Sequence, residues 1–275
     1  MSLRFPPLPR SVAEVATLLS EQQDVPDTPR LVEIAHADPS LALTVLRRAN
    51  SAFYGIPRQV EEVRQAVFLL GFLEVCNLVL ASGMQELRGL LSTAGQQRIF
   101  HAILRESLGT ACLAQQLALG LDLPHQSLAY TLGLLHNAGR LVLLYNMPDD
   151  YEALWDEENA PTAEDERARL GCEHRHLAVR AVEEWMLPVR LKRILEELAV
   201  PGSLDDDDLR PVAYALRVAR EALPSLLQGG HPDSDAYAVA CAELGNTVQL
   251  TAEMIDERVG AQRERVMRYL AVMQA

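Results

Sequence analysis

The residues best placed to do chemistry are His136 and the Asn137 that follows it, at the end of a strongly apolar stretch. A histidine followed by an acid at a buried helix end could hold a divalent metal and leave one position open to water, as metal-dependent hydrolysis requires. Here Asn137 replaces the acid, and its neutral amide oxygen is a poor ligand for a divalent transition metal. Taken alone, His136 is best interpreted as a hydrogen-bonded histidine of the core.

Other reaction chemistries have no matching pattern in the sequence. Gly229-Gly230 is not followed by the lysine and hydroxyl residue that a phosphate-binding loop needs. A serine or cysteine nucleophile would need a base and a residue that orients the base, and the sequence nominates no such set. Because no Cys-x-x-Cys pair occurs, neither a zinc knuckle nor a thioredoxin-type redox site is expected. The cysteines are interpreted as small buried apolar residues, at positions Cys76, Cys112, Cys172 and Cys241.

The composition predicts that helices position these residues. Of the 275 residues, 49% are hydrophobic but only 5% are aromatic, so aliphatic side chains must fill most of the core. Apolar residues recur at helical spacing, and no strand alternation of useful length is present. Asp38-Pro39 marks a helix start, because proline is favoured at the first helical position. One long helix is predicted over residues 97–119, and two closing helices over 234–244 and 247–270.

Charge and hydropathy limit the partners. The net charge of −13 repels phosphate backbones, so general nucleic-acid binding is not expected. Arginines at 47–48 and within 258–268 are interpreted as solvated helix faces rather than binding patches. No apolar run reaches the length of a membrane span, and prolines interrupt the N-terminal apolar run, so no signal peptide is recognised. A cytoplasmic protein without membrane association is expected.

Several motifs, taken in order, carry a resemblance to a known family. A proline-rich lead-in at residues 5–9 is followed by Asp38-Pro39-Ser-Leu and by the more specific Asn-Ser-x-Phe-Tyr-Gly at residues 50–55. Gly133-Leu-Leu-His136, a spaced Glu, Gly, His pattern over residues 166–174 and Trp-Met-Leu-Pro at 185–188 come later. The chain thereby resembles the HDOD family, a branch of the HD-domain phosphohydrolase superfamily, over roughly its first three-quarters. The signature residues are Asp38, Pro39, Asn50, Ser51, Phe53, Tyr54, Gly55, Trp185 and Pro188.

The resemblance implies where a metal site would lie. A working site would have a histidine near Ser107, an aspartate at Asn137 and a late aspartate in the helix after residue 208, and this sequence has none of them. Many relatives also carry a His-His pair where this chain has Glu196-Glu197. These departures suggest that the hydrolytic chemistry is absent.

The residues that remain are His136, Glu166, His174 and His176, and their side chains could converge in space. A divalent site normally needs three or four well-placed anionic or imidazole ligands and an open position. We therefore favour a hydrogen-bonded polar cluster, with no metal, no cofactor and no catalytic residue. This vestigial cluster comprises His136, Asn137, Glu166, His174 and Ser107.

The signature around Asn50 allows two interpretations. Asn50, Ser51 and Tyr54 could line a groove that receives a peptide or a small ligand. Alternatively, Asn50 and Ser51 bond the backbone in a turn that Gly55 ends, and we favour the turn. Phe53 and Tyr54 are expected to pack the two halves of the molecule together.

The resemblance implies an all-α HDOD fold, in which an N-terminal helical bundle packs on a C-terminal HD-like helical bundle. The expected segments are residues 1–94, residues 95–228 and a C-terminal helical extension over 229–275. An apolar stripe in this extension could form an interaction surface, but packing on the core is the favoured interpretation. The stripe consists of Val248, Ile255, Val259, Val266 and Leu270.

The family is bacterial and is associated with signal transduction. The resemblance therefore implies a non-catalytic signalling or regulatory module that acts by protein–protein interaction, with another signalling protein as partner and homodimerisation left open. One alternative is a divergent metal-dependent phosphohydrolase that acts on a nucleotide or cyclic dinucleotide. Another is nucleotide binding without hydrolysis, which would need an arginine cluster, and Arg140 and Arg175 are nearest to the candidate site in sequence.

Overall fold

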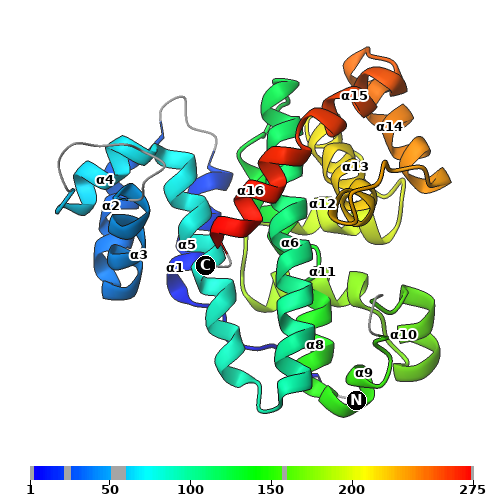
Figure 1. Ribbon diagram of the computed structural model, residues 1–275, viewed down its shortest axis with the longest axis horizontal. Helices are drawn as coiled ribbons and strands as arrows, with labels where there is room; N and C mark the ends of the chain where they lie inside the picture. Colours follow the sequence, from blue (N-terminus) through cyan, green and yellow to red (C-terminus); the bar gives the residue numbers. More distant parts are fainter. Residues whose placement is uncertain (1–2, 22–25, 51–59, 157–159, 274–275) are drawn as a thin grey trace. The chain divides into compact units, whose positions relative to one another are not determined.

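The computed structural model describes residues 3–21, 26–50, 60–156 and 160–273, and the regular elements among them are all helical (Figure 1). The predicted all-helical fold is confirmed. The chain divides into two compact units, Pro7–Leu87 and Arg88–Ala275, and the second unit also includes Met1–Pro6. The functional division into residues 1–94, 95–228 and 229–275 stays a prediction.

Local sequence signals set the helix ends in the smaller unit. The Asp38 side chain accepts hydrogen bonds from the backbone N–H groups of Ser40, at 2.8 Å, and Leu41, at 3.4 Å, so the predicted Asp38-Pro39 start is confirmed. Asn50 ends the same helix, and its side chain both donates to and accepts from the backbone of Val60. The helices of this unit are α1 (Arg10–Ser20), α2 (Thr28–Ala37), α3 (Pro39–Ala49), α4 (Val63–Leu70) and α5 (Phe72–Glu86).

The larger unit is organised around its longest helix, α6 (Ala94–Gly120), against which α7 (Leu128–Leu135) and α13 (Arg210–Leu227) pack. Thr93 and Gln96 form a capping box at the start of α6. The predicted long helix over residues 97–119 is therefore confirmed. The remaining elements are η2 (Leu87–Leu90), which starts in the smaller unit, α8 (Ala138–Asn146), α9 (Pro148–Glu152), α10 (Ala163–Leu170), α11 (His174–Glu184), α12 (Val189–Ala199), α14 (Asp235–Val248), α15 (Ala252–Ala261) and α16 (Arg263–Met273).

Two glycines let the helices around the candidate site approach closely. A Cβ at Gly133 on α7 would lie 2.3 Å from the Cα of Ala111 on α6. A Cβ at Gly139 on α8 would lie 1.8 Å from the carbonyl oxygen of His174. Because backbone atoms cannot move aside as a side chain can, only glycine fits at these two contacts. They bring the segment around His136 against α6 and against the first turn of α11.

The C-terminal extension packs on the rest of the larger unit through α14 on α13 and α16 on α6. Four of the five residues of the predicted stripe are buried, and Val248 is half-buried, which agrees with core packing. The single helix predicted over residues 247–270 is wrong. Gln249 adopts a left-handed conformation with φ 58°, and the Thr251 hydroxyl accepts from the backbone of Met254 to start α15.

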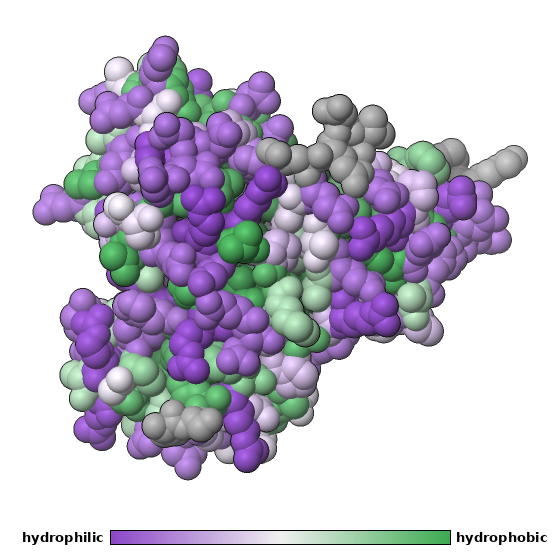
Figure 2. Space-filling model, turned by 180° about the vertical axis from the view of Figure 1, so that it is seen from behind, coloured by the Kyte–Doolittle hydropathy of each residue, from purple (hydrophilic) through white to green (hydrophobic). Residues whose placement is uncertain are grey.

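The face seen in Figure 2 is mainly hydrophilic, with small areas of hydrophobic side chains between the hydrophilic ones. Within the described part of the chain, no individual helix combines the length and apolar composition of a membrane span. The helical segments Val63–Leu70 and Phe72–Leu90 reach this length and apolar composition only when they are taken together, and the chain bends by 112° between them.

Candidate functional site

His136 lies at the junction of α7 and α8 and is 5% exposed. Its Nδ1 is 2.7 Å from the carbonyl oxygen of Gly133, which can only accept a hydrogen bond, so Nδ1 carries the proton. Burial lowers the pKa of His136 from 6.5 to about 4, and the ring is therefore neutral near pH 7. Its other nitrogen, Nε2, is buried without a hydrogen-bond partner among the described residues. The ring thus presents an unused lone pair.

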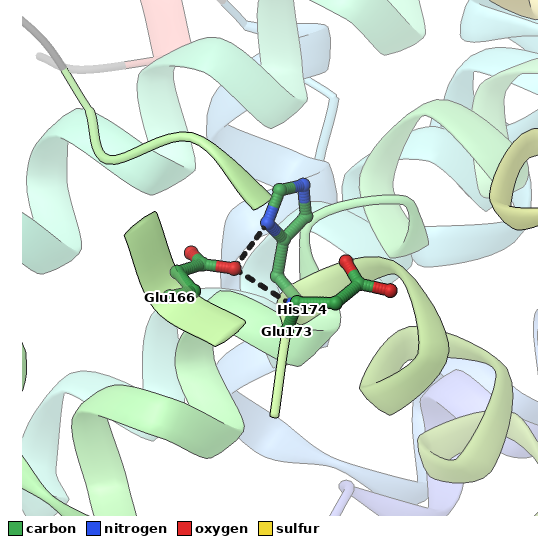
Figure 3. Close-up of side chains that lie close together, drawn as sticks. All are labelled: Glu166, Glu173 and His174. Atoms are coloured by element: carbon green, nitrogen blue, oxygen red, sulfur yellow. Dashed lines mark hydrogen bonds and ion pairs between the residues drawn. The ribbon is translucent and has the colours of Figure 1, made fainter. Parts of the chain in front are cut away.

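Glu166 on α10 is completely buried, and each of its two carboxylate oxygens accepts hydrogen bonds. Oε1 lies 3.0 Å from the Tyr151 hydroxyl and 3.4 Å from Nη1 of Arg140. Oε2 lies 2.7 Å from the backbone nitrogen of His174 and 2.6 Å from its Nδ1 (Figure 3). A carboxylate offers about four lone-pair positions, and these four donors occupy them.

The partners of Glu166 are themselves fixed. Arg140 is 7% exposed, and its Nη1 also lies 3.3 Å from the Tyr151 hydroxyl and 3.1 Å from the carbonyl oxygen of Pro161. Burial raises the pKa of Tyr151, so its hydroxyl keeps the proton that it donates to Glu166. Burial, and then the charges of Arg140 and Arg175, hold the pKa of His174 well below its usual range. Neutral His174 therefore donates from Nδ1 to Glu166 and keeps a lone pair on Nε2.

Glu166, Glu173 and His174 offer ligand atoms that all lie within 4.8 Å of one another, a spacing that could suit a metal ion. Glu173, however, caps the N-terminus of α11 by accepting from the backbone N–H groups of Arg175, at 2.9 Å, and His176, at 3.2 Å. The Nδ1 of His176 also contacts its carboxylate. In Figure 3 the carboxylate of Glu173 points away from the Glu166–His174 pair. Both carboxylates are therefore already engaged in hydrogen bonds.

A small cavity lies beside this cluster, within the larger unit. The space that the centre of a water molecule can occupy is about 10 Å³, which corresponds to roughly one water. Drug-sized ligands occupy pockets of about 300 Å³ or more, so a whole nucleotide does not fit inside this cavity. The cavity is lined by His136, His174, Arg175, Ala178, Leu195, Leu198 and Arg220.

The structure brings only part of the predicted cluster together. His136 and His174 line the same cavity, and Glu166 contacts His174 directly. Ser107 and Asn137 are buried but do not line the cavity. The side chain of His176 is 60% exposed and turns to Glu173, so it does not join the other histidines.

Three residues of the site were not nominated by sequence: Tyr151, Glu173 and Arg220. Of the two arginines that the sequence places nearest to a possible anion site, only Arg175 lines the cavity, because Arg140 is paired with Glu166. Glu173 could have been identified as a helix cap before the amphipathic stretch that follows it. Nothing local marks Tyr151 or Arg220, which reach the site through tertiary packing.

Two motifs of the family resemblance contact each other within the larger unit. Trp185 donates from Nε1 to the carbonyl oxygen of Pro6 at 2.8 Å, and it is buried. The guanidinium of Arg180 lies over the ring of Phe5, 5.3 Å from its centroid. The segment ending in Pro188 therefore anchors the proline-rich lead-in. The Asn50 side chain bonds the backbone of Leu46 and Val60, whereas Ser51, Phe53, Tyr54 and Gly55 lie outside the described residues, so the turn stays a prediction.

A family comparison decides the assignment. The sequence model of the HDOD domain matches residues 5–199, which is more than half of the chain. The chain belongs to the HDOD family. The family resemblance that the sequence motifs indicate is thereby confirmed for this HDOD protein. No curated protein matches the sequence.

Solved structures support the HDOD fold. An HDOD domain protein of unknown function from Geobacter sulfurreducens matches with a TM-score of 0.77 at 17% identity, covering 98% of this chain and 93% of the other. A proposed signal transduction protein from Marinobacter aquaeolei matches with a TM-score of 0.72 at 23% identity, covering 100% of this chain and 63% of the other. A proposed phosphohydrolase from Shewanella amazonensis matches with a TM-score of 0.65 at 20% identity, covering 98% of this chain and 95% of the other. At these identities the likeness establishes the fold alone.

Proposed function

We propose that this HDOD protein is a non-catalytic signalling or regulatory module that acts through protein–protein interaction. The observation that carries the proposal is the occupation of Glu166, whose four acceptor positions are filled by Tyr151, Arg140 and two groups of His174. One of these donors is a buried guanidinium. A positive charge beside the carboxylate takes the role that a metal ion would have, and it disfavours a second cation there.

The residues around the cavity support the same proposal. Asn137 and Ser107 stand where the family resemblance implies an aspartate and a histidine, and neither is an anionic or imidazole ligand. The cavity wall adds Arg175 and Arg220, which oppose a divalent cation electrostatically. His136 and His174 alone provide fewer ligands than a hydrolytic metal centre normally uses.

The divergent phosphohydrolase is the second candidate, because two observations favour it. Nε2 of His136 has no partner among the described residues, and Glu166, Glu173 and His174 are spaced closely enough to hold an ion. If the hydrogen bonds of Glu166 and Glu173 rearranged, these groups could become ligands.

Metal analysis combined with a turnover screen separates the two candidates. The protein is purified without chelators, its iron, manganese and zinc contents are measured, and phosphatase and phosphodiesterase substrates are tested with and without added metal. We expect metal well below one equivalent and no turnover. Stoichiometric metal with turnover that is lost in His136→Ala would overturn the proposal in favour of the enzyme.

The interaction part of the proposal rests on exposed apolar side chains, since Phe and Met are enriched in protein interfaces. Phe68 on α4 is 72% exposed, and Met186, two residues beyond the end of α11, is 88% exposed. Crosslinking in cells, with wild type compared against Phe68→Glu and Met186→Asn, tests this part. Asparagine suits Met186 because the backbone there has a φ of 54°. We expect a signalling protein, or a second copy of the chain, whose recovery falls in a variant; equal recovery from all three proteins argues against these surfaces.

A further inference from the structure

Two arginines give the cavity beside His136 a positive side. Arg175 reaches it from α11 and Arg220 from α13. Arg220 pairs with Glu221, at 3.1 Å from Nε and 2.5 Å from Nη2, whereas the Nε of Arg175 is buried without a hydrogen-bond partner among the described residues. Burial and the charge of Arg220 lower the pKa of the Arg175 guanidinium. Two guanidiniums that repel each other around a buried donor are stabilised by an anion.

Two histidines also line the cavity, and each has one ring nitrogen that its Nδ1 hydrogen bond leaves as an acceptor. The Nδ1 proton of His136 is used at Gly133, which leaves a buried lone pair on Nε2 with no partner in the described structure. The Nδ1 of His174 is used at Glu166, and Figure 3 shows the other ring nitrogen directed away from Glu166. A neutral ring with its proton on Nδ1 can only accept at Nε2.

The ligand must therefore accept hydrogen bonds from arginine and donate one to imidazole. A bare metal ion meets two positive charges, and a water molecule brings no negative charge to Arg175, whose Nε has no hydrogen-bond partner among the described residues. Sulfate supplies the negative charge, but it has no proton to donate to a ring nitrogen. The cavity has room for roughly one water inside. This size favours a small anion seated partly in the mouth, where the half-buried arginines lie, over any ligand with a base or sugar.

We propose that this cavity binds a small oxyanion that bears a hydroxyl group, the chemistry shared by hydrogen phosphate and bicarbonate. The charged oxygens face Arg175 and Arg220, and the hydroxyl donates to Nε2 of His136. The site requires neither turnover nor a protein partner, so it goes beyond the signalling function proposed above. It would make the stability of the segment that joins α7 to α8 depend on the anion concentration.

Isothermal titration calorimetry near pH 7.5 tests the site with inorganic phosphate, bicarbonate and sulfate at equal ionic strength. We expect saturable binding of about one equivalent for a hydroxyl-bearing anion, at least about tenfold tighter than sulfate, because sulfate leaves a buried acceptor unpaired. Arg175→Gln should weaken this binding at least about tenfold. Arg105→Gln removes the same charge from an exposed position on α6 and should leave it unchanged.

Nuclear magnetic resonance of the wild-type rings provides a second measurement that needs no destabilising variant. With ¹⁵N-labelled histidine, binding should move the Nε2 resonance of His136 and leave its Nδ1 resonance nearly unchanged. Three results would overturn the proposal: no saturable binding of either hydroxyl-bearing anion, sulfate binding of equal affinity, or full binding by Arg175→Gln. The metal and turnover tests are independent of all three, so failure here does not affect the proposed signalling function.

Discussion

The buried neutral ring of His136 makes the stability of this protein depend on pH. Its pKa is lowered from 6.5 to about 4, mainly by burial. Below pH 6.5 the imidazole of residue 136 is therefore protonated in the unfolded chain, whereas in the folded protein it is protonated only below about pH 4. The stabilisation is fully present above pH 6.5 and is lost as the pH falls from 6.5 to about 4.

The magnitude follows from that interval. At about 1.4 kcal/mol for each pH unit, the interval between 6.5 and 4 corresponds to about 3 kcal/mol. In a chain of this size, such a loss shifts the melting temperature by roughly 6–12 °C. His174 adds to the effect in the same direction, because its pKa is also lowered by burial. Glu166 acts in the opposite direction, since burial raises its pKa.

A comparison of variants isolates the contribution of His136 from these neighbours. Melting temperatures are measured from pH 7.5 to 4.0 for wild type, His136→Gln and His101→Gln. Between pH 7.5 and the lowest pH, the melting temperature of His136→Gln should fall by roughly 6–12 °C less than that of wild type. This difference is expected even if the variant is less stable than wild type at pH 7.5. His101 is exposed on α6, so its ring is hydrated in both states and His101→Gln should follow wild type. Parallel profiles for His136→Gln and wild type would refute the reasoning.

Three further changes test the frame of the site and the end of α3, each by thermal or urea unfolding. Glu166→Ala should cost about 3–5 kcal/mol, because it leaves the buried Arg140 guanidinium without its carboxylate. Glu164→Ala, on the exposed face of the same helix, should cost less than about 1 kcal/mol, and equal losses would contradict this account. Gly139→Ala should cost more than about 2 kcal/mol by pushing α8 off α11, whereas Gly120→Ala meets no atom within 4 Å and should be neutral or slightly stabilising. Asn50→Ala should cost about 0.5–1.5 kcal/mol in the smaller unit, because it removes the exposed hydrogen bonds that the side chain makes to the backbone of Leu46 and Val60, and no loss would contradict this account of the end of α3.

Much of the fold could be predicted because the relevant information is local. The aspartate and proline at residues 38–39 announce a helix start, and the structure shows the aspartate accepting from two backbone amides there. The wrong prediction of a single helix over residues 247–270 also comes from local sequence signals. A continuous apolar stripe outweighed Thr251, a good N-cap residue that the structure uses to start α15. Apolar periodicity identifies the buried face of a helix, but it does not show where the helix is interrupted.

The site could be predicted only in part. The order of motifs identified His136, Glu166 and His174, and the structure places them around one cavity and one carboxylate. It could not show how each polar atom is used. The donors to Glu166 come from α8, α9 and α11, and sequence spacing does not determine contacts between separate helices.

The sequence by itself determined the helical class, the HDOD membership and the lack of the expected residues at Ser107 and Asn137. These properties depend on residue type and on spacing within one or two turns of helix. Only the tertiary structure decided that Glu166 is saturated by buried donors, and that Arg220 shares a cavity with His136 although 84 residues separate them in the chain. The physical reason is that a polar group's chemistry depends on its burial and its partners, and both are set by packing between helices. The frame around His136 was thus readable from sequence, whereas the positive character of its cavity came from the fold.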